Sequence, residues 1–445
     1  MPEITHRKKR LSSFKLIVLG FAGVIVLGAL ILMLPFSSTD GVVTPFHEAL
    51  FTSTSAVCVT GLVVQDTGSY WSAFGQTVIL LLIQIGGLGV VTVAATFAML
   101  SGRKISLMQR STMQDAISAP KVGGIVRLTR FIVRGTFLIE LIGIIAMLPI
   151  FCGNFGIKGI WMATFHSISA FCNAGFDILG TAENKYPSLT GYIGNPTINI
   201  VVMLLIIIGG IGFWTWDDIC TNKWHFKKYR MQSKVILVTT MLLIIVPAVF
   251  FFFRDFTVLP LGERILASLF QSVTPRTAGF NTANLPAMTG SSKAIIILLM
   301  LVGGSPGSTA GGMKTTTLAV LILCAFSVCR KKDDTEVCGR RIDGSAVKNA
   351  ATVAVMYFLL FFIGGIVIST AEGLPLSTCL YETASAVGTV GLTLGITPQL
   401  GMLSQLILIV LMYLGRVGGL TLIYAAISNK NQGGAKLPLE KITVG

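Results

Sequence analysis

The chain has 445 residues, of which 53% are hydrophobic and only 12% are charged, whereas soluble globular proteins carry about 25% charged residues. This composition excludes an ordinary soluble protein. The formal net charge of +15 would suggest a nucleic-acid partner in a soluble chain, but here the basic residues form short clusters between apolar segments. The sequence therefore predicts a membrane protein without a large aqueous domain.

Apolar segments long enough to cross a bilayer, which takes about 20 helical residues, recur along the whole chain. They lie at 14–34, 73–100, 128–151, 197–219, 235–253, 292–329, 348–371 and 402–427. The first follows the basic cluster Arg7 to Arg10 but is too long for a signal peptide and lacks an Ala-x-Ala cleavage site. We therefore expect eight transmembrane helices.

The basic residues are distributed unevenly between the two ends of these segments. If both termini are cytoplasmic, 26 of the 34 Lys and Arg residues lie on the cytoplasmic side, as the positive-inside rule requires. Six are then expected outside, namely Lys158, Lys185, Arg254, Arg264, Arg276 and Lys293. The acidic residues expected outside are Asp40, Glu48, Asp66, Asp177, Glu183, Asp255, Glu263, Glu372 and Glu382. This slight acidic excess favours cations at the outer surface.

Residues that carry enzyme or metal chemistry form no recognisable cluster. The eight cysteines lie mostly in or beside apolar segments without CxxC spacing, so they are expected to be small buried side chains. His47 and His166 have no companion ligands. No arrangement of nucleophile, acid and base recurs at one depth, and we therefore expect no enzyme activity.

Four shorter apolar segments, each about half a membrane long, stand between the spans of successive pairs. They run from Phe46 to Leu62, Trp161 to Phe176, Arg264 to Phe280, and Leu376 to Leu392. Each ends beside a glycine, and these glycines, Gly61, Gly175, Gly279 and Gly391, are spaced by 114, 104 and 112 residues. A second glycine motif begins at Gly86, Gly209, Gly303 and Gly415, which follow the first by 25, 34, 24 and 24 residues. Two motifs in register predict four internal repeats.

Each repeat has two spans and therefore returns the chain to the side from which it started. All four copies then share one orientation, which favours pseudo-fourfold symmetry about an axis normal to the membrane over an inverted repeat. Non-helical backbone at membrane depth is tolerated where its carbonyl groups line an ion path. The fold expected is an all-α polytopic membrane protein with four span–pore-loop–span repeats around a central pore.

The expected organisation follows from these boundaries. The parts are a cytoplasmic N-terminus at 1–13, repeat 1 at 14–102, a cytoplasmic loop at 103–124, repeat 2 at 125–220, a loop at 221–233, repeat 3 with a broken last helix at 234–329, a loop at 330–346, repeat 4 at 347–428 and a cytoplasmic tail at 429–445.

The four sequences VCVTGL, CNAGF, RTAGF and TVGL, each in a span–loop–span unit, resemble the Trk/Ktr/HKT superfamily of potassium transporters. Within it the eight spans look most like the KtrB-type membrane subunits of bacterial Ktr systems. The resemblance implies a potassium filter with one glycine per repeat. The filter residues implied are Cys58, Val59, Thr60, Gly61, Asn173, Ala174, Gly175, Thr277, Ala278, Gly279, Thr389, Val390 and Gly391.

The last span of the third repeat is interrupted by a segment too rich in glycine and proline for a straight helix. It comprises Gly303, Gly304, Ser305, Pro306, Gly307, Ser308, Thr309, Ala310, Gly311 and Gly312. Its similarity to a phosphate-binding loop is incomplete, because Met313 breaks the spacing before Lys314. The resemblance implies an intramembrane gate, and the alternative is a kink without function. The small side chains predict conformers of similar energy.

Arg416 occupies a position of the second motif where the other three repeats have glycine. A charge within a span is costly and usually functional, and a guanidinium has five N–H donors. We expect Arg416, with Lys314, to hold the segment near Ser305 to Gly312 shut. The alternative is that Arg416 extends to the inner surface.

The function expected is potassium uptake through a central pore, with a sodium-permeable channel or an ion-coupled solute symporter as the alternative. K⁺ at the filter is the only metal ion expected, and no covalent cofactor. The loops contain no GxGxxG fingerprint, so nucleotide control would need another chain. The resemblance implies a homodimer and a cytoplasmic ring of nucleotide-binding subunits of the KtrA type, docking on basic inner loops that include Lys227, Lys228 and Arg230.

Overall fold

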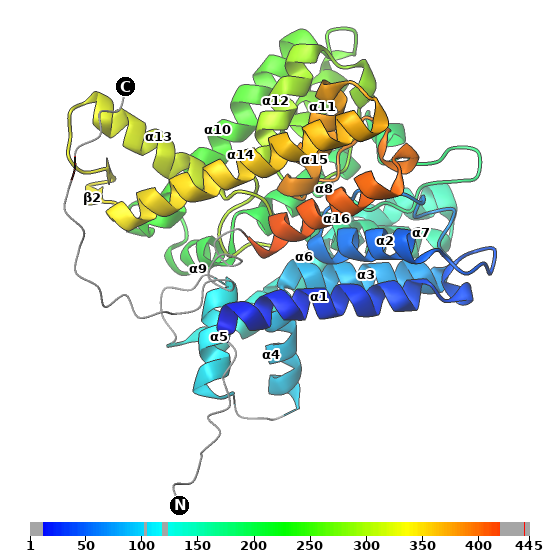
Figure 1. Cartoon of the computed structure of the whole chain (residues 1–445), viewed down its shortest axis with the longest axis horizontal. Coiled ribbons are helices and arrows are strands. Elements are labelled where there is room, and N and C mark those ends of the chain that lie inside the picture. Colours follow the sequence, from blue (N-terminus) through cyan, green and yellow to red (C-terminus); the bar gives the residue numbers. More distant parts are fainter. Residues whose placement is uncertain (1–11, 102–104, 118–122, 419–439, 441–445) are drawn as a thin grey trace, which may run out of the picture.

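A computed structural model describes residues 12–101, 105–117, 123–418 and 440 of the chain, and helices dominate it (Figure 1). The basic cluster Arg7 to Arg10, part of the predicted loop 103–124, the end of the span 402–427 and nearly all of the predicted tail 429–445 lie outside the described residues.

The helices form four successive units. Unit 1 contains α1 (Ser13–Leu32), α2 (Phe46–Cys58), α3 (Ala73–Leu88) and α4 (Val90–Leu100), and α5 (Leu107–Ile117) follows it. Unit 2 contains α6 (Ile125–Phe155), α7 (Lys158–Phe171), α8 (Pro196–Gly210) and α9 (Phe213–Asn222). Unit 3 contains α10 (Met231–Arg254), α11 (Leu261–Val273), α12 (Gly290–Leu301) and α13 (Thr315–Cys329). Unit 4 contains α14 (Gly344–Glu372), α15 (Leu376–Gly388) and α16 (Met402–Val417).

The remaining elements are short. Two antiparallel strands of two residues each, β1 (Glu336–Val337) and β2 (Arg340–Arg341), form a small hairpin between units 3 and 4, which leaves the expected all-α class unchanged. Single 3₁₀ turns occur at Pro35–Ser37, Thr190–Tyr192, Phe226–Lys228, Leu285–Ala287 and Thr397–Gln399.

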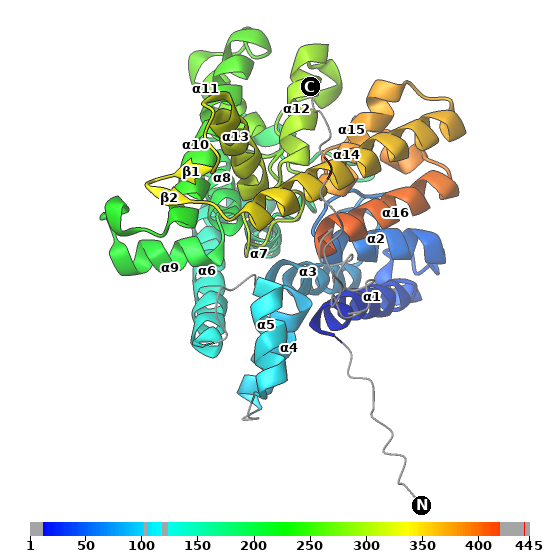
Figure 2. The same ribbon diagram turned by 60° about the vertical axis from the view of Figure 1, so that its left-hand side comes forward.

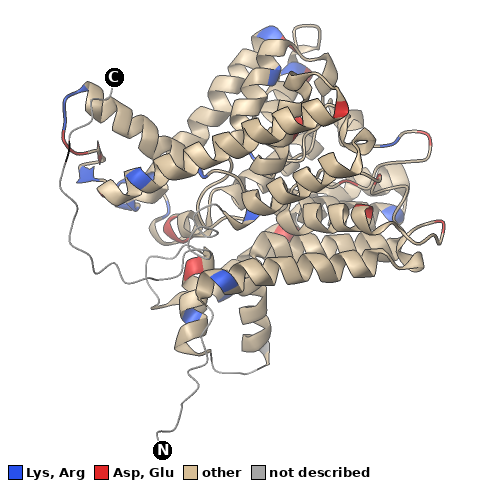
Figure 3. Cartoon of the chain, viewed as in Figure 1, with Lys and Arg blue, Asp and Glu red and all other residues tan. Residues whose placement is uncertain are grey.

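The first helix of each unit, α1, α6, α10 and α14, is long and apolar enough to cross a membrane. Large apolar side chains on these helices remain exposed, such as Leu27 on α1, Phe137 on α6 and Met241 on α10, and a lipid environment suits such faces. Charged residues are rare in the middle of the helices (Figure 3). The prediction of a membrane protein with several spans is confirmed.

The segments 73–100 and 197–219 were each predicted to be one span, but neither is a continuous helix in the structure. α3 and α4 meet at 94°, and α8 and α9 meet at 99°. The third glycine of the second motif lies at each break, with a φ of 84° at Gly89 and 91° at Gly212. A side chain disfavours this backbone conformation, which only glycine adopts freely. The broken helix expected only in the third repeat is therefore a feature of the first two as well.

The short helices α2, α7, α11 and α15 occupy the four shorter apolar segments predicted between the spans. A hydroxyl on each donates to a carbonyl oxygen of the first helix in the same unit. The four bonds are Ser53 to Ile25 at 2.7 Å, Ser167 to Glu140 at 2.7 Å, Ser272 to Ile244 at 2.5 Å and Thr383 to Phe361 at 3.0 Å. The same bond in every unit sets the position of the short helix against its span.

The residue three positions after each accepting carbonyl is a glycine in units 1, 2 and 4, namely Gly28, Gly143 and Gly364. A Cβ at Gly28 would lie 2.5 Å from Ser53 Oγ, so the missing side chain lets the two helices approach. Unit 3 has Pro247 there instead. Because proline has no N–H, the carbonyl of Leu243 lacks its helical donor, and Ser272 Oγ also lies 3.3 Å from that oxygen.

This packing predicts that Gly143→Ala destabilises the protein. The new Cβ would contact Ser167 Oγ and lie 2.8 Å from Leu205 Cδ1, and overpacking of this kind costs about 1–3 kcal/mol. Gly153→Ala on the same helix is the control, because no atom lies within 4 Å of its Cβ position. We expect thermal unfolding in detergent to shift downward for the first variant only. Equal melting temperatures for both variants would contradict the close packing.

Contacts between units follow one rule. The helix after the short helix in each unit packs against the short helix of the next unit, in the pairs α3 with α7, α8 with α11, α12 with α15, and α16 with α2. The last pair joins unit 4 to unit 1, which lie side by side in Figure 2. The four units therefore form a closed arrangement, with the C-terminal ends of the short helices at its inside.

Candidate functional site

The segments that follow the short helices share one backbone conformation. We call residues 58–61, 173–175, 277–279 and 389–391 the glycine loops. Their glycines have positive φ angles of 91° at Gly61, 67° at Gly175, 80° at Gly279 and 93° at Gly391. The residue two positions earlier is also left-handed in each loop, at Val59, Asn173, Thr277 and Thr389. Alternation of left-handed and ordinary φ turns successive carbonyl groups toward one side of the chain.

Left-handed backbone at Val59, a β-branched residue, is a genuine outlier among side-chain-bearing residues. Such conformations cost about 1–3 kcal/mol each and cluster at functional sites. The same strain in all four units points to a common purpose rather than to a local defect.

The four glycines close a ring in chain order. A Cβ on Gly61 would lie 2.5 Å from the carbonyl oxygen of Ala174, and one on Gly175 would lie 2.6 Å from that of Ala278. A Cβ on Gly279 would meet the carbonyl oxygen of Val390, and one on Gly391 would meet that of Thr60, which returns to unit 1. Each glycine therefore faces the residue before the glycine of the next unit, and no side chain fits in the ring.

Hydroxyl groups on the short helices hold the loops in place. Ser55 Oγ accepts from the N–H of Gly61 at 3.0 Å, and Ser385 Oγ accepts from that of Gly391 at 2.9 Å. In unit 2, Ser169 donates to the carbonyl of Phe176 at 2.8 Å, and in unit 3 Thr274 donates to that of Phe280. Sequence analysis did not identify these residues, although a serine six positions before the glycine recurs in three repeats.

The second glycine motif is a packing surface in three units. Cβ atoms on Gly86, Gly209 and Gly415 would meet the carbonyl oxygens of Val57, Phe171 and Val387 respectively. Each of those carbonyls lies four residues before a ring glycine. These glycines therefore let the following helix reach the end of the short helix.

Unit 3 differs, because its motif begins the segment 303–312, which we call the broken-helix loop. A Cβ on Gly303 would meet the carbonyl of Gly311 within the same loop, and one on Gly311 would meet Thr389 Oγ1 in a glycine loop. The broken-helix loop therefore lies directly against the ring.

The broken-helix loop is hydrogen-bonded to unit 2 at four places. Its N–H groups at Ser305 and Thr309 donate to the carbonyls of Gly210 at 2.9 Å and Gly209 at 3.2 Å. Thr309 Oγ1 donates to Phe171 at 3.1 Å, and the carbonyl of Gly307 accepts from the N–H of Phe213 at 2.7 Å. Unit 2 therefore anchors the broken-helix loop in the conformation that the structure shows, and the prediction of conformers of similar energy stays a prediction.

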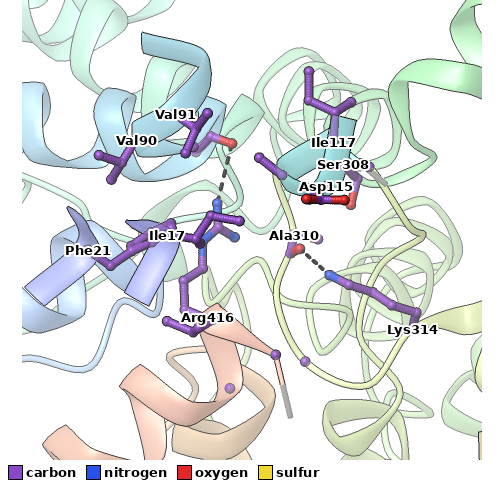
Figure 4. Close-up of a pocket in the computed structure, with 18 of the residues that line it drawn as sticks. Ile17, Phe21, Val90, Val91, Asp115, Ile117, Ser308, Ala310, Lys314 and Arg416 are labelled. Carbon is purple, nitrogen blue, oxygen red and sulfur yellow. Dashed lines mark hydrogen bonds between the residues drawn. The ribbon is translucent and has the colours of Figure 1, made fainter. Parts of the chain in front are cut away.

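Arg416 and Lys314 both donate to carbonyls of this region. Arg416 bonds to Thr309 of the broken-helix loop, to Gly86, and to Gly87 at 3.3 Å. Lys314 Nζ donates to Ala310 at 2.7 Å and to Gly311 at 3.3 Å. The Arg416 side chain thus joins units 4, 3 and 1. The bonds of Lys314 stay within unit 3, and its bond to Ala310 is drawn in Figure 4.

A cavity of about 300 Å³ is lined by Arg416 and Lys314 together with other residues drawn in Figure 4. Asp115 of α5 lines it together with Ser308 of the broken-helix loop. A helix within the predicted loop 103–124 therefore reaches this cavity, which sequence analysis did not anticipate.

Cys58, a predicted filter residue, ends α2 and is buried, so it precedes the left-handed part of its loop. Glu140 on α6 accepts from Gln84 Nε2 of α3 at 3.0 Å and 3.3 Å. All eight cysteines are unpaired, and within the described residues no group of three metal-ligating side chains occurs.

Comparison with known proteins agrees with this geometry. Residues 21–434 match the family described as "TrkH: Cation transport protein". The "Potassium/sodium uptake protein NtpJ" of Enterococcus hirae is 39% identical over 98% of both chains. The "Ktr system potassium uptake protein B" of Bacillus subtilis is 36% identical over 92% of both chains, and that of Vibrio alginolyticus is 33% identical over 95% of this chain and 93% of its own.

The potassium transporter TrkH from Vibrio parahaemolyticus shares the fold. Its crystal structure superposes with a TM-score of 0.74, covering 95% of this chain and 86% of that chain at 19% identity. The resemblance inferred from the four glycine motifs is confirmed. This chain, a multi-pass membrane protein and not an enzyme, belongs to the TrkH family of cation transport proteins.

Proposed function

We propose that this chain is the membrane subunit of a Ktr-type potassium uptake system, in which K⁺ crosses the membrane through the ring of glycine loops. The observation that carries the proposal is the closed ring, in which each glycine faces a carbonyl of the next unit. Carbonyl oxygens arranged in this way replace the hydration shell of a cation. Four short helices end at the ring, and their negative C-terminal ends favour the same charge.

Unpartnered polar atoms support this path. The hydroxyls of Thr60, Thr277 and Thr389 are buried beside the ring glycines and have no hydrogen-bond partner within the described residues. Buried polar atoms normally find partners. A path for water and ions would supply them.

In this proposal the pseudo-fourfold ring is surrounded by eight membrane-crossing segments, counting each bent pair as one and the two halves of the broken helix as one. The broken-helix loop lies under the ring as the gate, and the termini are cytoplasmic. Lys and Arg residues gather at the N-terminus and in the loops on the same side of the membrane, and the positive-inside rule makes that side cytoplasmic.

Radiotracer flux into proteoliposomes tests the function. The purified chain should take up K⁺ and Rb⁺ in preference to Na⁺, and an amino acid mixture should not compete. The name of the relative NtpJ includes sodium, so a Na⁺-permeable pore is the second candidate. Na⁺ flux equal to K⁺ flux would favour that candidate, and coupled solute uptake would favour a symporter.

Regulation is proposed to come from a cytoplasmic ring of nucleotide-binding subunits of the KtrA type, bound to a homodimer of this chain. The relatives named as Ktr system proteins support a multi-subunit system. Lys227 and Lys228 are exposed on the loop after α9 and suit an acidic partner surface. Arg230 is less suited than expected, because it pairs with Asp217 at 2.9 Å and Asp218 at 3.5 Å.

We expect this complex to be salt-sensitive, because exposed ion pairs are screened within about 10 Å at 0.1 M salt. Purification at low salt should recover the nucleotide-binding partner, and a Lys227→Glu, Lys228→Glu variant should lose it. Lys185→Glu, an exposed lysine in another loop, is the matched control and should retain it. Full nucleotide regulation by the purified chain alone would overturn the proposal.

A further inference from the structure

A second cavity lies on the opposite side of the ring from the broken-helix loop. It has a volume of about 260 Å³ and is lined by all four ring glycines. The chain enters it as it leaves the glycine loops, so in the proposed orientation it is the outer entrance to the pore.

The residues two positions after the ring glycines form a second layer in this cavity. They are Val63, Asp177, Asn281 and Thr393, and all four line it. Asp177, Asn281 and Thr393 have oxygen atoms in their side chains, and Val63 does not. The hydroxyl of Thr393 is already engaged with Glu382 and Thr397, which leaves Asp177 and Asn281 as candidate ligands from neighbouring units.

Asp177 is the carboxylate with spare capacity. Its Oδ1 accepts from the N–H of Leu179 at 3.1 Å, and no donor bonds to Oδ2 in the described part of the chain. The neighbouring Asp66 is instead occupied by three donors, the N–H of Ser69 at 2.8 Å, its hydroxyl at 2.7 Å and the N–H of Tyr186 at 2.9 Å. Asp66 therefore holds the loop, whereas Asp177 is open to the cavity.

The surroundings favour a cation. The described lining contains two carboxylates, Asp66 and Asp177, and the phenol of Tyr186, but no Lys, Arg or His. Asn281 donates its Nδ2 to the carbonyl of Ala283 at 2.9 Å, which fixes the amide and leaves its oxygen as an acceptor. Oxygen ligands of this kind suit alkali cations.

We propose that Asp177 and Asn281 hold a partly hydrated monovalent cation in this cavity before it enters the ring of glycine carbonyls. The inference rests on the proposed function and adds an entry site to it. Only unit 2 supplies a carboxylate at this layer, so replacing Asp177 removes the charge of the layer and leaves Asp66 in the lining.

The experiment measures the external K⁺ concentration for half-maximal uptake in proteoliposomes that contain the full chain. Asp177→Asn is expected to raise this half-saturating concentration about 10-fold, since a cleft lined by charge of one sign concentrates cations at least to about this extent. Glu183→Gln removes an equal charge from an exposed position in the same loop and should leave the half-saturating concentration unchanged.

A double variant, Asp177→Asn with Asn281→Asp, moves the carboxylate to the next unit and should restore the affinity. If Asp177→Asn fails to fold, Asn281→Asp alone should lower the half-saturating concentration. Unchanged affinity in Asp177→Asn, or an equal change in Glu183→Gln, would overturn the entry site while leaving potassium transport established. No K⁺ uptake by the unaltered chain would instead overturn the proposed function.

Discussion

Serine in place of Gly61 is expected to reduce K⁺ uptake about tenfold or more and to diminish the preference for K⁺ over Na⁺. The position for the new Cβ lies 2.5 Å from the carbonyl oxygen of Ala174 and 3.2 Å from the Cα of Gly175. Both contacts are backbone, which has nowhere to move without opening the ring. Overpacking of about 1–3 kcal/mol corresponds to about 5- to 150-fold in an equilibrium, and the φ of 91° adds strain for any side chain.

Gly23→Ser on α1 provides the control for this variant, because no described atom lies within 4 Å of the Cβ position at Gly23. It should insert and transport like the unaltered chain. Tracer uptake of K⁺ and Na⁺ is measured for both, after size-exclusion chromatography confirms folding. Normal affinity and selectivity in a folded Gly61→Ser variant would show that this loop does not contact the ion.

Removing the Arg416 guanidinium is expected to increase basal flux. Its three carbonyl bonds tie the broken-helix loop at Thr309 to Gly86 and Gly87 of unit 1, so Arg416→Ala releases the loop from one side. Bonds to a charged donor contribute about 1–3 kcal/mol, which changes the open fraction by about 5- to 150-fold. Deletion of several residues within 305–311 should act in the same direction and more strongly, since it also removes the anchors to Gly209 and Gly210.

Lys314→Ala separates loss of charge from loss of the latch. Lys314 donates only to Ala310 and Gly311 within the broken-helix loop, so its removal leaves the contact with unit 1 intact and should increase flux less than Arg416→Ala. Flux is measured with and without the nucleotide-binding partner. If deletion within 305–311 changes neither basal flux nor the response to the partner in a folded protein, the broken-helix loop is only a helix break.

The membrane class, the four repeats and the family followed from the sequence because each depends on patterns local to the chain. Apolar segments of spanning length identified α1, α6, α10 and α14, and glycines in register identified the four loops. A glycine that recurs at one position of each repeat marks a backbone requirement, and that requirement is visible without knowing what lies opposite.

The bends at Gly89 and Gly212 were missed for a physical reason. Both helices that meet at each break are apolar, so composition does not distinguish a straight span from two helices at 94° or 99°. Contacts with other units determine where each segment bends. The N–H of Phe213, just after the second bend, bonds to the carbonyl of Gly307 in another unit. Hydropathy records that a segment is buried, but not the direction in which it runs.

The sequence by itself determined which residues lack side chains at the ring, which segments cross the bilayer and where a charge interrupts a span. The tertiary structure alone decided what each of them faces. The partner of Gly391 is Thr60, and the partners of Arg416 include Gly86, both more than 300 residues away. The second layer, with Asp177 and Asn281 in the lining of one cavity, likewise exists only when units meet. Such contacts arise from closure of the four units around one axis, and closure is a property of packing between distant segments rather than of any local pattern.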